Sequence, residues 1–426
     1  MLKTFRALSI RNFRVYVTGT VVSNVGTWMQ RIGQDWLVLE LSGGSGTAVG
    51  ITTAMQFLPV LLLSPLAGML ADRYPKRRLM QATAVMMAVP ALVLGILAIT
   101  GTAEVWHVYV LAFLFGAGAA LDAPARQSFV PELVGKDEIA NAIGLNSVSF
   151  NLARIVGPAL AGLLIAAFGS GEAAAGWVIC TNAATYLATI WALQMIDPAK
   201  LVVRPRAPLR RGMMGEAVRY VRGHRRLAFV FCIAFITGTF GINFQLTNAL
   251  MATQEFGQGA GGFGLLGSVM AIGSFTGALL AARRATVTSR IVATSAIAFG
   301  VAQLIASVMP TFAMFTAWTI VVGLCTMLMA NACHASVQIF TDPEVRGRVT
   351  ALYVMVSMGG VPLGAAVIGW VGETFGPRWT LVFGGGIVLV ATLLAMLLLR
   401  PGRAVEDAPA EVPAPEVSAP AGERRA

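Results

Sequence analysis

The chain has 426 residues, of which 56% are hydrophobic and 12% are charged, and its mean hydropathy is +0.73. Soluble domains average about 45–50% apolar and about 25% charged residues, so this composition excludes an ordinary soluble protein. The net charge of +11 is not carried by a basic, aromatic-bearing soluble module. We therefore expect a protein that lies in the lipid bilayer and binds no nucleic acid.

Apolar runs of about 20 residues recur along the chain, and each is long enough for a helix to cross a hydrocarbon core about 30 Å thick. They are too long and too uniformly apolar for barrel strands. The first run contains Arg31 and Asp35 and does not end in a small-residue cleavage site, so we expect no cleaved signal peptide. We predict twelve membrane-spanning helices: 15–40, 46–70, 79–100, 106–125, 141–168, 175–195, 227–252, 262–282, 291–308, 311–336, 349–373 and 378–399.

The basic residues predict the orientation in the membrane. All but three of the 31 lysines and arginines fall in the amino-terminal segment, in alternate loops or in the tail. Cytoplasmic loops accumulate Lys and Arg, so we expect a multi-pass protein of the cell inner (plasma) membrane with both termini in the cytoplasm. The three exceptions are Arg31 and Arg154, inside predicted helices, and Arg378, on the opposite side.

The alternation of apolar runs and polar segments predicts that the chain has four parts. Residues 1–196 form an amino-terminal six-helix bundle, 197–226 a basic cytoplasmic linker, and 227–400 a carboxy-terminal six-helix bundle. Residues 401–426 are rich in Ala, Pro and Glu, so we expect a disordered cytoplasmic tail. The fold class is therefore an all-α membrane protein with two pseudo-symmetric six-helix bundles.

Glycines and prolines support a repeat of the two halves. Gly157, Pro158 and Gly162 in the fifth helix and the 360–364 stretch of the eleventh place interruptions at corresponding positions. Corresponding breaks are typical of transporter repeats. Gly and Pro are also common in membrane helices generally, which is the alternative explanation.

The first helix carries a polar stripe. Asn24, Trp28, Arg31 and Asp35 fall on one narrow face at helical spacing. Ionisable residues inside a bilayer usually face a bundle interior or a wet cavity, so we expect this face to line a substrate cavity. Arg31 and Asp35, at i and i+4, can pair, and protonation of Asp35 would release the arginine.

Two other helices of the first half carry buried charge. Arg154 lies on the same face of the fifth helix as Asn151 and is expected to meet an acid or an anionic substrate. The alternative is a static network of Arg31, Asp35 and Arg154 that holds two helices together. Asp122 and Arg126, near the cytoplasmic end of the fourth helix, are interpreted as a gate or structural pair rather than as substrate ligands.

The second half has two polar stripes among aromatic residues. Asn243 and Thr247 lie on one face of the seventh helix, and Asn331, His334 and Gln338 share a face of the tenth. Such stripes suit a cavity that orients an apolar ligand with a few hydrogen bonds, although they also serve as interhelical hydrogen bonds. His334 is a candidate coupling residue because histidine titrates near neutral pH.

No catalytic or metal-binding pattern competes with these features. The four cysteines fall inside apolar helices without CxxC or His/Cys ligand spacing. Glycine-rich stretches lack a preceding strand and a P-loop lysine. We expect neither an enzyme nor a protein with a metal or cofactor.

The loop after the second helix reads Gly68-Met-Leu-Ala-Asp72-Arg73-Tyr-Pro-Lys76-Arg77-Arg78. Gly68 would let two helices approach closely, and Asp72 could accept hydrogen bonds from the next helix. This stretch resembles the GxxxDRxxxRR signature of the major facilitator superfamily in spacing and position. The second-half copy keeps Gly277 and the basic pair but has Ala281 in place of the acid.

Other segments resemble the exporting branches of that superfamily. Gly157-Pro158 with Gly162 resembles the antiporter motif, and the stretch from Gly26 to Leu39 resembles the first helix of the efflux branch that contains macrolide and siderophore (enterobactin-type) exporters. Arg346-Gly347-Arg348 is similar to a further loop element. One departure is that 106–111 lacks the arginine that many drug-proton antiporters carry, so the usual proton relay cannot be transferred.

The resemblance implies a secondary active transporter that works by alternating access. We expect proton-coupled export of small hydrophobic or amphipathic molecules such as drugs, siderophores or secondary metabolites, by a monomer whose partners are the substrate, protons and the lipid bilayer. Coupling would use Asp35 with Arg31 and Arg154, and Gly68, Asp72, Arg73, Arg77 and Arg78 would control cytoplasmic closure. The alternatives are an importer of a sugar or organic anion and a non-transporting membrane sensor.

Overall fold

The computed structural model describes residues 3–202, 213–283 and 287–399, and within these ranges its regular elements are all helices. The α-helices are α1 (Arg11–Leu41), α2 (Gly46–Arg73), α3 (Lys76–Ile99), α4 (Val105–Phe129), α5 (Ile139–Ala167), α6 (Glu172–Met195), α7 (Met213–Gly223), α8 (Arg225–Ile236), α9 (Phe244–Leu250), α10 (Ala260–Ala282), α11 (Ser289–Ser307), α12 (Phe312–Phe340), α13 (Arg346–Gly359), α14 (Val361–Phe375) and α15 (Pro377–Leu399). Four short 3-10 helices are η1 (Lys3–Ser9), η2 (Val130–Glu132), η3 (Lys136–Glu138) and η4 (Pro198–Lys200). Two π-helices are η5 (Thr237–Gly241) and η6 (Met251–Glu255).

Eleven helical segments in the described part of the chain are long and apolar enough to cross a membrane. The twelfth is α1, whose 31 residues span about 46 Å. Its buried polar side chains, among them Gln30, Gln34 and Asp35, explain why it is less apolar than the other eleven. The predicted fold class is confirmed, with helix ends within a few residues of the expected positions.

The breaks along the helices differ from the sequence-based expectation. The seventh span is interrupted by η5 and by two non-helical residues before α9, and the eleventh breaks at Gly360 between α13 and α14. The fifth span does not break, because α5 continues through Pro158. The prediction of matching interruptions is therefore wrong for the fifth helix. A membrane helix tolerates an internal proline where neighbouring groups satisfy the freed backbone.

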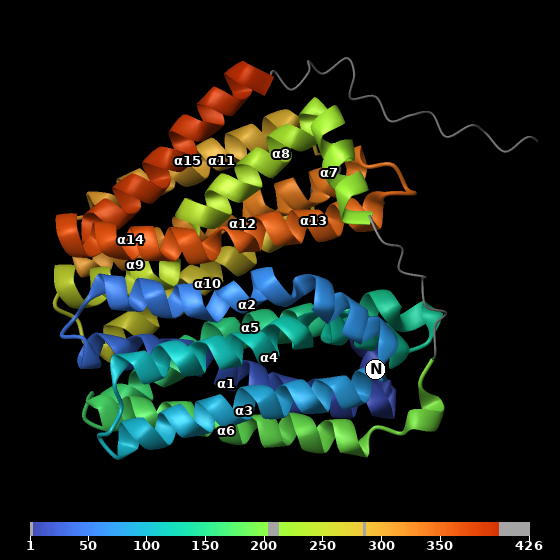
Figure 1. Ribbon diagram of the computed structural model, residues 1–426, viewed down its shortest axis with the longest axis horizontal. Helices are drawn as coiled ribbons and strands as arrows, with labels where there is room; N and C mark the ends of the chain where they lie inside the picture. Colours follow the sequence, from blue (N-terminus) through green and yellow to red (C-terminus); the bar gives the residue numbers. More distant parts are fainter. Residues whose placement is uncertain (1–2, 203–212, 284–286, 400–426) are drawn as a thin grey trace, which may run out of the picture.

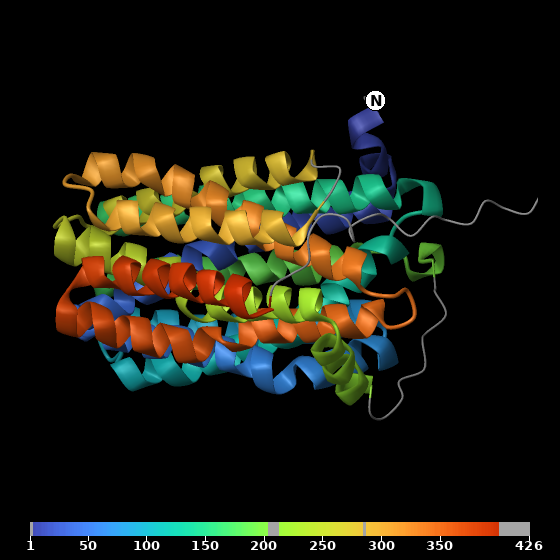
Figure 2. The same cartoon turned by 90° about the horizontal axis from the view of Figure 1, so that it is seen from above.

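The helices form two bundles that lie side by side with their axes roughly parallel (Figures 1 and 2). Helices α1–α6 make one half, which is the lower one in Figure 1, and α8–α15 make the other. The short helix α7 packs on the second half against α8 and α13. Residues 203–212, between η4 and α7, and residues 401–426 of the predicted tail lie outside the described ranges.

The two ends of the bundles differ in charge. One end, which we call the basic end, carries η1, the turn between α2 and α3 and the turn between α12 and α13, with their arginines. The other end, which we call the acidic end, carries Glu40, Glu104, Glu172, Glu255 and Glu373. Its arginine, Arg378, donates from Nε to Glu255 at 2.7 Å and from Nη1 to the carbonyl of Ser307 at 2.6 Å.

At the acidic end the two halves are joined by close contact between α2 and α14. A Cβ atom at Gly50 would lie 2.5 Å from the carbonyl oxygen of Ala365, and one at Gly46 would lie 2.8 Å from that of Gly369. A side-chain oxygen of Glu373 accepts hydrogen bonds from Ser45 Oγ and from the backbone N–H of Thr47, each at 2.8 Å. Small residues thus bring two backbones into contact, and a carboxylate binds the first turn of α2.

Helices α5 and α10 join the halves at the same end. A Cβ atom at Gly162 would lie 2.6 Å from the carbonyl oxygen of Ala260, and one at Gly264 would lie 2.4 Å from that of Pro158. The Gln254 side chain also donates to the carbonyl oxygen of Gly44 across the boundary. The acidic end is therefore closed by two helix pairs and by hydrogen bonds.

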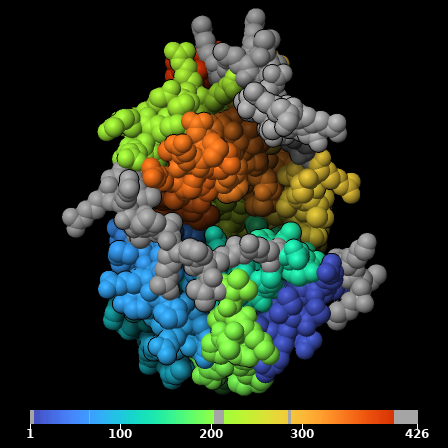
Figure 3. All heavy atoms as spheres, turned by 90° about the vertical axis from the view of Figure 1, so that its right-hand side faces the viewer, coloured from blue at the N-terminus to red at the C-terminus, as the bar shows by residue number. Residues whose placement is uncertain are grey.

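The basic end is hollowed between the halves. Figure 3 looks onto this end and shows a recess between the orange helices of the second half and the blue and teal helices of the first. In the described part of the chain, the side-chain hydrogen bonds that cross between the halves lie at the acidic end. The halves therefore diverge from the acidic end toward the basic end.

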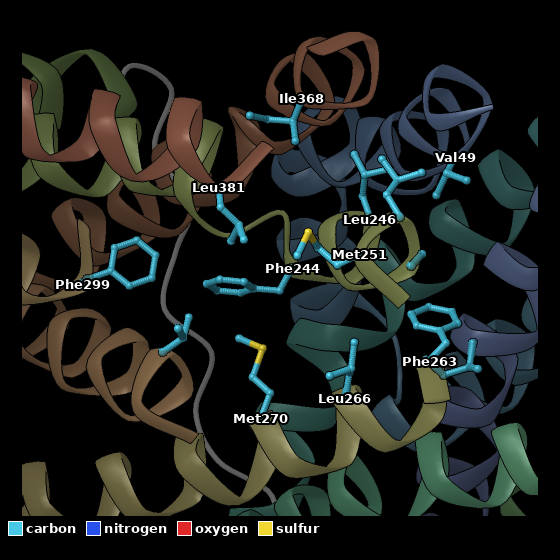
Figure 4. Packing of buried hydrophobic residues seen from close by; sticks show 14 of the residues in the cluster. Val49, Phe244, Leu246, Met251, Phe263, Leu266, Met270, Phe299, Ile368 and Leu381 are labelled. Carbon is cyan, nitrogen blue, oxygen red and sulfur yellow. The ribbon is translucent and has the colours of Figure 1, made fainter. Parts of the chain in front are cut away.

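The apolar core continues across the boundary near the acidic end. Figure 4 shows Phe244 and Leu246 of α9 among buried residues of α10, α14 and α15. Phe244 meets Phe299 of α11 edge-on at 5.8 Å between ring centroids. Val49 of α2, in the other half, belongs to the same buried cluster.

The glycine contact at α2 makes a specific prediction. We expect Gly50→Val to destabilise the closed acidic end by about 1–3 kcal/mol, because the added side chain meets the α14 backbone. Val49→Cys, on a background without the four native cysteines, reports opening by its labelling rate with a membrane-impermeant thiol reagent. Val49 is fully buried here, so labelling should be slow before and faster after the glycine substitution.

The matched control is Gly386→Val on α15, where an added Cβ meets open space. We expect this control to leave the labelling rate unchanged. Equal labelling of the two variants would contradict the assignment of the α2–α14 contact as the seal of the acidic end.

Candidate functional site

The polar stripe of α1 meets α5 at Trp28. The Arg31 guanidinium lies 4.5 Å from the centroid of the Trp28 ring, and the Arg154 guanidinium lies 5.5 Å from it. Gly157 allows this approach, because a Cβ atom there would be 2.5 Å from the Trp28 Cβ. Both guanidinium groups are thus placed on a single indole, at distances typical of cation–π contacts.

Arg31 and Asp35 do not form an ion pair in this structure, although both belong to the described residues. The Arg31 Nε and Asp35 Oδ2 atoms are both buried and lack a hydrogen-bond partner. Helical side chains lean toward the helix N-terminus, which turns Arg31 toward Trp28 and away from Asp35. The two charges still interact through space, but the predicted i, i+4 pairing is not made.

Asp35 lies where the two halves meet. Its side chain is 2% exposed, and its carboxyl group interacts with the side-chain amide of Gln245 on α9, in the other half. Helices α1 and α9 are in contact at this level. A carboxylate in this position can respond to the relative placement of the halves.

Several side-chain amides near the polar stripe of α1 were not predicted as site residues from the sequence. Gln34 Nε2 donates to Gln56 Oε1 of α2 at 3.3 Å, and Asn182 of α6 donates to the Gln30 side chain. Phe57 of α2 lies 5.7 Å from the Arg31 guanidinium. Glutamines inside predicted membrane helices were the available signal, since polar side chains there need a partner.

The other two cavity candidates of the first half, Asn151 and Asn24, make no hydrogen bond to this cluster in the described part of the chain. Asn151 donates to the carbonyl of Ser147, one turn earlier on α5, at 2.9 Å. Asn24 is partly exposed on α1. The Trp28 ring meets Phe150 edge-on at 5.9 Å, which adds an aromatic wall beside Arg154.

The second-half candidates do not form one cluster. Asn243 and Thr247 are buried, and Asn243 lies at the break between η5 and α9, where its Nδ2 donates to the Thr239 carbonyl at 2.7 Å. The Asn243 Oδ1 atom has no partner. A broken helix leaves backbone and side-chain groups available at mid-membrane depth, as transporter sites do.

The α12 candidates lie closer to the basic end. Gln338 Nε2 donates to Thr350 Oγ1 of α13 at 3.0 Å, which is an interhelical hydrogen bond. His334 is exposed, and its ring meets Tyr353 of α13 edge-on at 5.7 Å between centroids. Asn331 is partly exposed on the same helix.

The loop motif between α2 and α3 is not engaged with the other half. A Cβ atom at Gly68 would meet nothing within 4 Å, so the expected close helix approach is absent in this conformation. Asp72, Arg73 and Arg78 are exposed. Arg77 donates from Nη1 to the carbonyl of Ile196 at the end of α6, at 3.1 Å. At the open basic end, Gly68 has no helix opposite to pack against.

Asp122 and Arg126 form the ion pair that their spacing predicts. Arg126 Nε lies 2.7 Å from Asp122 Oδ2, and Thr83 of α3 donates to Asp122 Oδ1 at 2.9 Å. Tyr16 of α1 packs edge-on against Phe129 beside them. The pair therefore ties α4 to α3 inside the first half.

The sequence profile of a family described as "Transmembrane secretion effector" matches residues 2–426 of this chain. The chain belongs to that family of major facilitator transporters. It is a transporter and not an enzyme, and the proposed resemblance to the efflux and siderophore branch is confirmed.

Three curated relatives illustrate this branch. The staphyloferrin A transporter of Staphylococcus aureus is 24% identical over 355 residues, which cover 83% of this chain and 87% of that protein. The multidrug efflux pump Tap of Mycolicibacterium fortuitum is 25% identical over 397 residues, covering 89% and 91%. Macrolide efflux protein A of Streptococcus pyogenes is 29% identical over 121 residues, covering 28% and 30%.

Solved structures share the fold. A bacterial homologue of the human lysosomal transporter Spinster, in an inward-facing and unoccupied conformation, has a TM-score of 0.71 at 15% identity and covers 92% of this chain and 98% of its own. A bacterial homologue of the iron transporter ferroportin, in an inward-facing state, has a TM-score of 0.68 at 13% identity, covering 91% and 98%.

The ion pair inside the first half predicts a measurable loss of stability. We expect Asp122→Asn to lower the free energy of unfolding by about 2–3 kcal/mol, because it leaves the mostly buried Arg126 without its counter-charge. Titration of the purified protein with a denaturing detergent measures this change.

Lys200→Gln is the control, since it breaks the exposed pair of Lys200 with Asp197 at 3.6 Å. We expect a change of less than about 1 kcal/mol there. If the two variants unfold alike, the Asp122–Arg126 pair does not stabilise the first half.

Proposed function

We propose that this transporter exports small amphipathic organic molecules from the cytoplasm by alternating access, with protons as the coupling ion. The observation that carries the proposal is the asymmetry of the two ends. The halves are closed at the acidic end by α2–α14 and α5–α10 and are hollowed at the basic end (Figure 3).

Charge gives the proposed orientation. Basic loops remain on the cytoplasmic side, so the hollow end is assigned to the cytoplasm together with both termini. A substrate would then enter from the cytoplasm or the inner leaflet and leave after the acidic end opens. The names of the relatives, two of which are efflux proteins, support this direction.

The proposed moving parts are the predicted ones, residues 1–196 and 227–400, joined by the linker 197–226, within a monomer. Closing the basic end would bring the second half toward the α2–α3 loop. Gly68 has free space beside it and Asp72 is exposed, so both are available for contacts in the other state. This supports a gating role for the loop.

The proposed coupling residue is Asp35. Its carboxyl group is buried, lies near Arg31 and interacts with Gln245 of the other half. Protonation removes the negative charge that offsets Arg31 and replaces one acceptor by a donor at the boundary. The protonated and charged forms would therefore favour different placements of the halves, which is what coupling requires.

The substrate is found by expressing the protein in a host strain that lacks its own exporters and measuring tolerance to a panel of compounds. Raised tolerance names compounds for a direct assay in inverted vesicles, where a proton gradient drives uptake. We expect collapse of the gradient to stop uptake.

In the same vesicles we expect Asp35→Asn to reduce gradient-driven uptake at least about tenfold, since the titrating group is removed. Glu40→Gln, which removes one negative charge from the exposed end of the same helix, should transport like the parent. Parental transport by Asp35→Asn, or transport that is indifferent to the gradient, would contradict the coupling role.

A further inference from the structure

Two guanidinium groups share one aromatic ring inside the membrane without an acid between them. Arg31 and Arg154 lie on the Trp28 ring at 4.5 and 5.5 Å from its centroid, and the two charges interact with each other. Neither side chain makes an ion pair or a hydrogen bond among the described residues. This arrangement leaves excess positive charge at the middle of α1 and α5.

The neighbouring acid does not neutralise both cations. Asp35 interacts with Arg31 through space but is not within ion-pair distance, and Arg154 has no acidic side chain among its interactions. Like charges in a low-dielectric setting repel strongly, and an unpaired buried charge is costly. The balance is restored most directly by an anion that enters between the halves.

The aromatic residues around the two arginines also indicate the shape of the ligand. Phe57 of α2 lies 5.7 Å from the Arg31 guanidinium, and Phe150 of α5 meets the Trp28 ring edge-on. Arg31, Arg154, Trp28 and Phe57 are all partly exposed although they lie in the interior of their helices. Flat apolar groups can pack on such rings, while guanidinium forks match the two oxygens of a carboxylate.

We propose that the Arg31–Trp28–Arg154 cluster binds the anionic oxygen group of an amphipathic substrate, so that this exporter takes organic acids with a flat apolar part. The inference rests on the proposed export function and narrows its substrate class. A neutral compound of the same shape would leave the excess positive charge of the two arginines uncompensated, and a cationic one would be repelled.

The test uses two probes of nearly the same shape, 1-naphthaleneacetic acid and 1-naphthaleneacetamide, of which only the acid is ionised at pH 7.5. Binding of each to the full-length protein in lipid nanodiscs at pH 7.5 is measured by calorimetry. We expect the acid to bind at least about tenfold more tightly than the amide, the size of effect that a charge-assisted hydrogen bond supplies.

Two variants test whether Arg31 and Arg154 cause the preference for the acid. We expect Arg31→Gln and Arg154→Gln each to reduce the acid-to-amide affinity ratio to within about twofold of one, with binding of the amide retained as evidence of folding. The matched control, Arg11→Gln, removes an exposed arginine from the basic end of the same helix and should keep the parental ratio.

Equal affinity of the parent for the two probes, failure of the acid to bind, or an unchanged ratio in both variants would each overturn the inference. The result is separable from the export proposal. Export of neutral or cationic compounds without a preference for the acid would contradict this inference alone. A preference for the acid without export in vesicles would contradict the proposed function alone.

Discussion

The structure depends on one constraint, which is that charge inside hydrocarbon must have water, a counter-charge or an aromatic face beside it. Arg31, Asp35 and Arg154 lie inside their helices without ion pairs to other described residues. Both arginines contact an indole and are partly exposed, whereas the buried Asp35 interacts with an amide. These residues are compatible with a membrane only if the halves enclose an accessible space at their level. Arg31 and Arg154 are partly exposed, and the halves are hollowed at the basic end (Figure 3).

The closed end obeys a different constraint. In a membrane, helices gain little from hydrophobic burial against each other, so they hold together through close packing and hydrogen bonds. Gly46, Gly50 and Gly162 allow backbone contact between the halves, and Glu373 adds hydrogen bonds to the start of α2. Such contacts are individually small and can be broken as a set. Contacts of this kind can form and break in a gate, whereas the buried ion pair of Asp122 and Arg126 stabilises one half permanently.

Much of the fold was predictable because it depends on local sequence. Apolar length predicted twelve spans, of which eleven are long and apolar enough in the structure and α1 is the twelfth, and i, i+4 spacing predicted the Asp122–Arg126 pair. The same spacing failed for Arg31 and Asp35, because the ring of Trp28 competes for the guanidinium, and a rotamer choice of that kind depends on neighbours from α2 and α5. The free space at Gly68 was equally unpredictable, since it depends on how far apart the halves lie in the conformation observed.

The central claim is that the two ends open and close in opposition. Spin-label distances across the halves test it most directly, with one pair at the basic end (Asp137→Cys and Glu344→Cys) and another at the acidic end (Thr102→Cys and Val308→Cys), all four sites being exposed. Both distances are measured at low and at high pH in the presence of an exported compound. We expect the pH change that shortens the basic-end distance also to lengthen the acidic-end distance. Distances that stay fixed, or that change in the same direction at both ends, would contradict the account.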